Sequence, residues 1–177
     1  MIGMIEPAPQ NPMEKGTFDR LARTYQKAFR GIYEDIGLYA DGVKKVAELG
    51  CGQGPIVQAA LSAFSQAHID AVDAFDILIP EIKSNPRVEF HLSKIIEILE
   101  SKKLGKLNTV VLRGTRNHHG LNEGNIHLLK NLLDAEGILI TDSDNGDIED
   151  QDWFKKQFQQ IWGREEFWAL RAWKAIK

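Results

Sequence analysis

The sequence predicts an α/β fold: a doubly wound, mostly parallel, Rossmann-like sheet of six or seven strands with an antiparallel last strand. Two observations lead to it. Short apolar runs typical of buried strands alternate with segments of helical periodicity from residue 45 to residue 142. The length of 177 residues suits one compact domain, and the sequence contains no internal repeat and no interior linker. Right-handed crossovers would then place helices on both faces of the sheet.

The first ordered element should be an amphipathic helix. The opening MIGMIEPAPQNP contains three prolines and predicts a loose N-terminal arm over residues 1–14. From Thr17 onward, apolar residues recur at helical spacing, which predicts a helix over residues 15–30 with one face turned inward. A short second helical segment would end at Tyr39. We therefore expect a single domain over residues 15–177 with a helical cap at its N-terminus.

Five strands and three helices should follow in alternation. The strands are KVAEL, HIDAVD, RVEFHL, LNTVVLR and GILITD, at residues 45–49, 68–73, 87–92, 107–113 and 137–142. The helices are PIVQAALSAFSQ, KIIEILESKK and GNIHLLKNLL, at residues 55–66, 94–103 and 124–133. Pro55 suits a first helical turn, where its missing N–H costs nothing, and Asn122 can cap the third helix.

The C-terminal part departs from this alternation. Residues 147–162 predict a helix whose aromatic side chains turn inward, and residues 165–177 predict a final strand. Because no crossover helix separates the two segments, the final strand is expected to run antiparallel to the rest. Most of the aromatic residues in this part are expected to fill the core.

Composition excludes several classes of partner. A net charge of -3 and a pI near 6.0 give no general attraction to nucleic acid. Cys51 is the only cysteine, so an internal disulfide is excluded, and a reducing compartment fits. No apolar run approaches a membrane span, and the N-terminus lacks the pattern of a secretion signal. We expect a cytoplasmic protein with no membrane partner, and the oligomeric state is not determined by the sequence.

The strongest functional signal is AELGCGQGP, residues 47–55, between the first strand and its helix. Gly50, Gly52 and Gly54 permit positive φ and let a ligand approach where a Cβ would collide. In an open parallel sheet, ligands bind beyond the carboxyl ends of the strands, where the strand order reverses. The dinucleotide fingerprint G-x-G-x-x-G would need its last glycine at Pro55, so the spacing disfavours NAD and FAD.

This stretch resembles the first motif of class I S-adenosylmethionine-dependent methyltransferases, whose fold is a seven-stranded, doubly wound sheet. The resemblance extends from FDRLARTY, which is similar to the segment before this motif in many small-molecule methyltransferases, to the final strand. It implies S-adenosylmethionine as the cofactor. The three glycines, with the small Cys51 among them, would pass under its methionine part, and Glu48 would orient its ammonium group.

Further cofactor-binding residues are expected at the next strand ends. Asp73 ends the second strand, where a carboxylate can accept hydrogen bonds from ribose hydroxyls, unless it only caps the turn. The resemblance implies that Ala74 and Phe75 pack against the adenine ring. Many family members then have an acid that receives the adenine amino group. This chain has Ser93 and Lys94 there, and because a lysine has no acceptor, Ser93 or a backbone carbonyl is the candidate.

The loop RGTRNHHG, residues 113–120, faces the acceptor substrate in the family. Methyl transfer requires a nucleophile held in line and close, and it needs a base only when the acceptor loses a proton. His118 and His119 titrate near neutrality and are the catalytic candidates, with a polar loop that caps the next helix as the alternative. Arg113 is a candidate cofactor-binding residue, although it could instead pair with an acidic substrate or face solvent.

We expect no metal site, with a site built from Asp142, Asp144, His118 and His119 as the alternative. The acidic run TDSDNGDIED, residues 141–150, fails as an EF-hand loop because Asp147 and Trp153 occupy the positions of the required glycine and glutamate. Asp142 is the exception within this run, since it should lie at the carboxyl end of the fifth strand, on the ligand side of the sheet.

These features predict an S-adenosylmethionine-dependent methyltransferase that acts on a small-molecule acceptor. The alternative is a non-catalytic binding or regulatory module with a methyltransferase-like fold. Lys94 favours this alternative, as does Asn108, which stands in the fourth strand where the family commonly has an aspartate. A nicotinamide-dependent oxidoreductase is a third option, which the glycine spacing disfavours.

Overall fold

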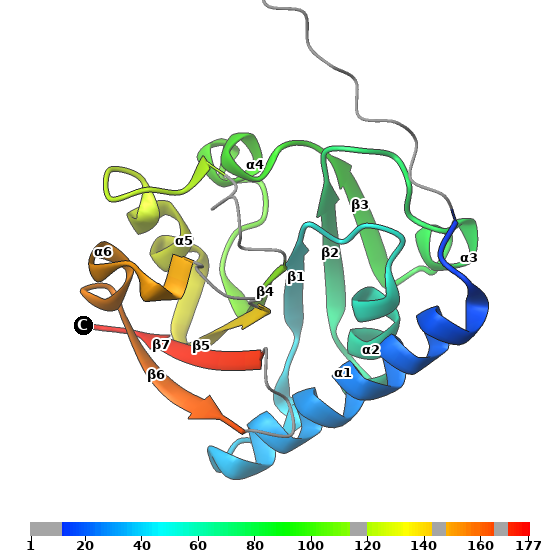
Figure 1. The fold of residues 1–177 in the computed structure, drawn as a ribbon, viewed down its shortest axis with the longest axis horizontal. Helices are drawn as coiled ribbons and strands as arrows, with labels where there is room; N and C mark the ends of the chain where they lie inside the picture. Colours follow the sequence, from blue (N-terminus) through cyan, green and yellow to red (C-terminus); the bar gives the residue numbers. More distant parts are fainter. Residues whose placement is uncertain (1–11, 114–119, 143–147, 165–169) are drawn as a thin grey trace, which may run out of the picture.

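The computed structural model describes residues 12–113, 120–142, 148–164 and 170–177 of the chain. These residues form a seven-stranded sheet in the order β3-β2-β1-β4-β5-β7-β6 (Figure 1). The strands are β1 (Lys45–Leu49), β2 (His68–Asp73), β3 (Val88–Leu92), β4 (Leu107–Arg113), β5 (Leu133–Asp142), β6 (Phe158–Gly163) and β7 (Leu170–Ala175). Strands β1 to β5 pair in parallel, and β7 runs antiparallel to β5 and β6. The predicted fold class and the antiparallel last strand are confirmed.

Helices cover both faces of this sheet. They are α1 (Lys15–Asp35), α2 (Pro55–Ala63), α3 (Pro80–Lys83), α4 (Ile95–Ser101), α5 (Ile126–Leu132) and α6 (Asp152–Lys155), with 3-10 turns η1 (Ala40–Gly42) and η3 (Ile148–Asp150). One hydrophobic cluster joins α1 and α2 to the sheet, and a second joins α4, α5 and α6 to its other face. Neighbouring strand residues alternate between them, as Val46 and Ala47 do.

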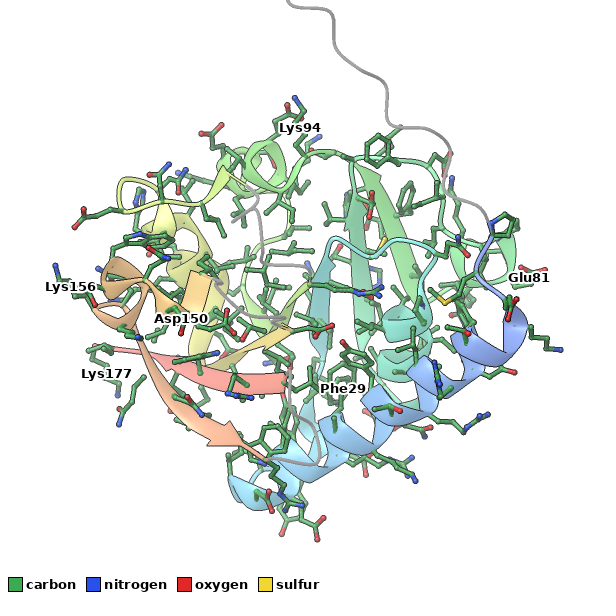
Figure 2. The ribbon with its side chains drawn as sticks, in the orientation of Figure 1. Phe29, Glu81, Lys94, Asp150, Lys156 and Lys177 are labelled. Carbon is green, nitrogen blue, oxygen red and sulfur yellow. The ribbon has the colours of Figure 1, made fainter. Side chains whose placement is uncertain are left out.

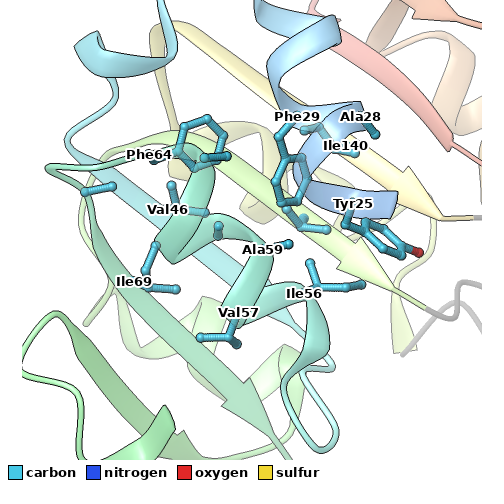
Figure 3. Packing of buried hydrophobic residues seen from close by; sticks show 14 of the residues in the cluster. Tyr25, Ala28, Phe29, Val46, Ile56, Val57, Ala59, Phe64, Ile69 and Ile140 are labelled. Atoms are coloured by element: carbon cyan, nitrogen blue, oxygen red, sulfur yellow. The ribbon is translucent and has the colours of Figure 1, made fainter. Parts of the chain in front are cut away.

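Helix α1 is part of the core on the first face. It lies alongside α2 in Figure 1, and its inner residues are buried, in agreement with the predicted inward face. Phe29 is fully buried and stacks on Phe64 with ring centroids 5.4 Å apart, over Val46 and Ile69 of the sheet (Figure 3). The helix ends where Gly37 takes a positive φ of 71° and its N–H bonds the carbonyl of Glu34.

The helix predicted over residues 147–162 is wrong. Only the short α6 forms, and the chain then enters β6, which pairs with β7. The spacing of Phe154, Phe158 and Trp162 suited one helical face, but Phe158 belongs to the second hydrophobic cluster and Trp162 to the first. A strand with a register shift places these two side chains on opposite faces of the sheet, which no helix of this spacing would do. Their burial in the core was predicted correctly.

Among the residues described, no helix has both the length and the apolar character that crossing a bilayer requires.

Asn108 lies at the start of β4, among the amino ends of the parallel strands, whereas the glycine turn follows the carboxyl end of β1. Its Oδ1 accepts hydrogen bonds from the backbone N–H groups of Lys44 and Lys45, at 2.8 and 2.9 Å. Its Nδ2 donates to Asp134 Oδ2 at 2.5 Å. The side chain therefore joins the starts of β1, β4 and β5, and it is remote from the carboxyl ends of the strands. Asn108 thus gives no support to a non-catalytic module, and this corrects its interpretation from the sequence.

We expect Asn108→Ala to lower the free energy of unfolding by about 1–2 kcal/mol, because two backbone N–H groups lose their acceptor. Urea unfolding measures the change. Asn131→Ala is the matched control on the exposed surface of α5, with an expected change within about 0.5 kcal/mol. Equal effects of the two substitutions would contradict the structural role of Asn108.

Candidate functional site

The turn between β1 and α2 brings the backbone to the surface of a cleft. Gly50, Gly52 and Gly54 have φ values of 87°, 55° and 95°, which favour glycine. A Cβ on Gly52 would have space, since the nearest atom, Arg113 Nη1, is 3.9 Å away. A Cβ on Gly54 would lie 2.5 Å from Leu78 Cδ1. Gly54 therefore packs against the side chains of Leu78 and Ile82, whereas Gly50 and Gly52 line the cleft.

The cleft has a volume of about 790 Å³, within the range of small-molecule sites. It lies at the carboxyl ends of β1, β2, β3 and β4, where the strand order reverses around β1. Its lining residues are Met13, Gly50, Gly52, Gln53, Asp73, Ala74, Phe75, Ile77, Lys94, Ile95, Ile96, Arg113 and Gly120. Four successive strand ends thus contribute to one site.

Asp73 holds the glycine turn against the end of β2. Its Oδ2 accepts a hydrogen bond from the backbone N–H of Gly52 at 2.8 Å, and its Oδ1 accepts one from Phe75 at 2.9 Å. A carboxylate oxygen can accept more than one hydrogen bond. The two roles considered for Asp73, a cap of the turn and an acceptor for a ligand, are therefore compatible.

One end of the cleft is apolar. Ala74, Phe75 and Ile77 line it from the segment after β2, and Ile95 and Ile96 line it from the first turn of α4. The Phe75 side chain is 46% exposed, which is unusual for a large aromatic residue in this chain. An exposed aromatic face inside a cleft offers a flat surface for a stacked ring.

At the other end Arg113 lines the cleft, and its charged neighbour Asp142 is not among the lining residues. Arg113 Nε lies 3.9 Å from Asp142 Oδ2, and both side chains are largely buried. The hydroxyl of Tyr25, from α1, donates a hydrogen bond to the same carboxylate oxygen. Burial raises the pKa of the Tyr25 hydroxyl far above its usual range, and the charge of Asp142 adds to this. The hydroxyl therefore remains protonated and acts as a donor.

Glu48 is buried in β1 behind this charged end. Its side chain is 1% exposed, and neither carboxylate oxygen makes a hydrogen bond of ordinary geometry within the described residues. Burial raises the pKa of this carboxyl well above its usual range, although Arg113 and the backbone of Val57 oppose the change. The charges of Asp73 and Asp142 raise it further. A buried acid in such surroundings favours a cation in the adjacent cleft.

Some candidates from the sequence do not line the cleft. Cys51 is fully buried, and burial raises the pKa of its thiol, so it fills the turn as a neutral side chain. Ser93 borders a different depression, and its hydroxyl donates to the carbonyl of Lys94. Lys94 is at the rim with its side chain turned to solvent, 3.8 Å from Glu97 (Figure 2).

His118 and His119 fall in residues 114–119, which are not among those described. The flanking residues Arg113 and Gly120 both line the cleft. Sequence reasoning missed Tyr25 as a site residue, because its spacing in α1 marks it only as part of the buried stripe. Its contact with Asp142 joins residues 117 positions apart, and no local signal indicates such a contact.

Comparisons with known proteins identify the fold. No protein-family model and no curated protein matches the sequence. Solved structures do resemble it. The MycE methyltransferase from the mycinamycin biosynthetic pathway, in complex with Mg and SAH, has a TM-score of 0.61 and 13% identity, covering 94% of this chain and 49% of that one. The precorrin-6y C5,15-methyltransferase from Geobacter metallireducens has a TM-score of 0.57 and 13% identity, covering 85% and 88%.

A third structure is the plantazolicin methyltransferase BpumL, in complex with a monoazolic desmethylPZN analogue and SAH. Its TM-score is 0.52, with 16% identity over 71% of this chain and 50% of that one. The chain therefore spans about half the length of BpumL and of MycE. These likenesses agree with the strand order and with the antiparallel β7. The chain has the fold of the class I S-adenosylmethionine-dependent methyltransferases.

Proposed function

We propose that the chain binds S-adenosylmethionine in the cleft and transfers its methyl group to a small-molecule acceptor. The order of chemical environments along the cleft carries this proposal. The apolar end at Phe75 suits an adenine ring, and Asp73 suits the ribose hydroxyls. The positive-φ glycines leave space for the methionine part beside Arg113. These are the three parts of the cofactor, in the sequence in which they are bonded.

The charge of the site supports a cationic ligand. Among the described residues, the charged groups of Asp73, Asp142 and Arg113 all act electrostatically on the buried Glu48, and Arg113 lies 3.9 Å from Asp142. S-adenosylmethionine has a sulfonium and an ammonium group against one carboxylate, so its net charge is complementary to this cluster. Its binding would favour the ionised form of Glu48, because a nearby positive charge offsets the effect of burial on the pKa.

The bound cofactor supplies an activated methyl group, and the protein supplies position. We assign Glu48 and Asp142 to the ammonium group and Asp73 to the ribose. Tyr25 and Arg113 both contact the Asp142 carboxylate and would fix its position beside the cleft. We also propose His118 and His119 as the base for an acceptor that loses a proton, since the two residues that flank their segment line the cleft. Alignment of the acceptor with the methyl group is the main catalytic requirement.

A small-molecule acceptor is supported by two features. The net charge of -3 gives no general attraction to a nucleic acid. BpumL was solved with a monoazolic desmethylPZN analogue, and MycE belongs to the mycinamycin biosynthetic pathway. We further infer that residues 15–177 act as one domain. Each of the two hydrophobic clusters includes residues from both the N-terminal third and the C-terminal third of the chain. Turnover of the methyl group distinguishes this proposal from a non-catalytic binding module.

The first test is calorimetric titration with S-adenosylmethionine and S-adenosylhomocysteine. We expect micromolar binding, about -8 kcal/mol, and no comparable binding of NADH. Asp73→Asn should weaken binding by about 10-fold or more, since the charge and one acceptor are lost. Asp150→Asn, on an exposed residue away from the cleft, is the matched control (Figure 2). A folded protein that binds neither sulfur compound would refute the proposal.

The aromatic wall of the cleft gives a second test. Phe75→Ala is expected to weaken S-adenosylmethionine binding by about 10-fold, or about 1.4 kcal/mol, through loss of ring stacking. The unfolding temperature should hardly change, because the side chain is already 46% exposed. Tyr39→Ala removes an aromatic ring that is 86% exposed and outside the cleft, and it should leave the affinity unchanged. Equal S-adenosylmethionine affinities of the two variants would show that Phe75 does not contact the cofactor.

The buried Glu48 predicts a pH dependence of stability. Its folded pKa is raised, so the folded state holds a proton that the unfolded state releases. This stabilisation is complete below the unfolded pKa and is lost as the pH rises through the folded pKa. Glu48→Gln cannot ionise, and we expect it to raise the unfolding temperature of the ligand-free protein, increasingly from about pH 5 to about pH 8.

Thermal unfolding across this pH range measures the effect. Glu100→Gln removes an exposed carboxylate from α4 and serves as the control, with no pH-dependent gain expected. An unfolding temperature of Glu48→Gln that differs from wild type by the same amount at every pH would show that Glu48 ionises in the folded chain as it does in the unfolded one.

A further inference from the structure

A second polar cluster lies on the sheet at the edge formed by β2 and β3. It contains His68 and Asp70 from β2 and Glu89 and His91 from β3, and the register pairs Asp70 with Glu89. These side chains extend from the face that bears the second hydrophobic cluster, because they alternate with residues of the first. None of the four lines the cleft. The proposed methyl transfer therefore gives them no role.

Asp70 is the buried acidic residue of this cluster. Its side chain is 3% exposed, and burying a carboxylate is unfavourable unless positive partners surround it. Its Oδ1 accepts a hydrogen bond from His91 Nε2 at 2.9 Å. Its Oδ2 lies 3.5 Å from Lys45 Nζ but makes no hydrogen bond among the described residues. Lys45 is also bonded to the carbonyl of Leu104, at 2.5 Å.

The donor atoms of the cluster are spaced as a metal requires. His68 Nε2 lies 3.8 Å from Asp70 Oδ1 and 3.7 Å from Glu89 Oε2, and the three residues offer donor atoms within 4.8 Å of one another. Ligands at about 2.0–2.1 Å from a tetrahedral Zn²⁺ are roughly 3.4 Å apart. The two distances from His68 exceed this spacing by only a few tenths of an ångström, and the whole set would contract from within 4.8 Å as it closes on the ion. Glu89 and His68 are 62% and 41% exposed, so both side chains are free to adjust.

We propose that His68, Asp70 and Glu89 bind Zn²⁺, with water at the fourth position. Imidazole nitrogen and carboxylate oxygen are both Zn²⁺ ligands, and three protein ligands with one water complete a tetrahedral site. His91 is a positioning residue: its N–H holds the Asp70 carboxylate, as residues around metal ligands commonly do. Lys45 engages the other carboxylate oxygen and leaves Oδ1 to His91 and the metal. The ion would tie the edge strand β3 to β2 and stabilise the folded chain.

The test uses the full-length protein without an affinity tag, after removal of metal with a chelator. We expect calorimetry to show one Zn²⁺ bound per chain, and the unfolding temperature to rise with added Zn²⁺. Co²⁺ in place of Zn²⁺ should give visible absorption bands without a thiolate charge-transfer band, because Cys51 is buried and outside the cluster. A wild-type chain that binds no Zn²⁺ would overturn the proposal.

Substitutions of single residues test which side chains bind the Zn²⁺ ion. His68→Gln and Glu89→Gln remove half-exposed side chains, so the chain should fold, and each should lose the Zn²⁺ site. His91→Phe should weaken Zn²⁺ binding by roughly 10–100-fold without abolishing it. His127→Gln on the exposed face of α5 and the pair His118→Gln with His119→Gln should bind as wild type does. Unchanged Zn²⁺ affinity in His68→Gln and Glu89→Gln would contradict the site.

S-adenosylmethionine affinity separates this proposal from the proposed function. The cluster is outside the cleft, so His68→Gln should keep the cofactor affinity of the wild type while it loses Zn²⁺. Loss of cofactor binding by Asp73→Asn with Zn²⁺ binding retained is the converse result. A loss of both ligands in His68→Gln would mean that the metal acts on the cleft or on the whole fold, and it would overturn the assignment of an independent site.

Discussion

The parallel pairing of β1 with both β2 and β4 is the constraint on which the rest of the structure depends. Strands β2 and β3 lie on one side of β1, and the chain then crosses over to form β4 on its other side. The helices that follow β1 and β3 therefore diverge at the carboxyl end of β1. The divergence opens the cleft at the strand ends. Gly50, Gly52 and Asp73 occupy it because they directly follow or end those strands.

Two acids buried in this sheet have opposite surroundings. Glu48 is behind the cleft, where burial and two neighbouring carboxylates keep its pKa high, and a cationic ligand would relieve that condition. Asp70 is nearer the amino end of the strands, where His91 and Lys45 already supply positive partners or donors. A hydrophobic residue would fill either position at lower cost. Glu48 and Asp70 are therefore the buried acids on which the two proposed sites depend.

The C-terminal strands show how tertiary pairing overrides a local pattern. Phe154, Phe158 and Trp162 recur at intervals of four, which is a helical spacing. The free edge of β7 offers backbone hydrogen bonds to the segment from Phe158, and the two faces of the sheet each take one of its aromatic side chains. Phe158 stacks on Phe154, whose ring also meets Trp173 of β7. Trp173 belongs to the strand after β6, so a local rule does not include its contact with Phe154.

The sequence by itself determined the fold class, the first, second and fourth strands with their bounds, and the glycine turn with Asp73 at the end of the next strand. These features are local. A strand is indicated by its own apolar run, which also indicates where the strand ends, and a turn with positive φ favours glycine. Only the tertiary structure decided that Tyr25 contacts Asp142, that Gly54 serves packing, that Asn108 is remote from the cleft, and that His68 meets Glu89. The physical reason is that such contacts depend on strand order and register, which are set by the packing of the whole sheet rather than by neighbouring residues.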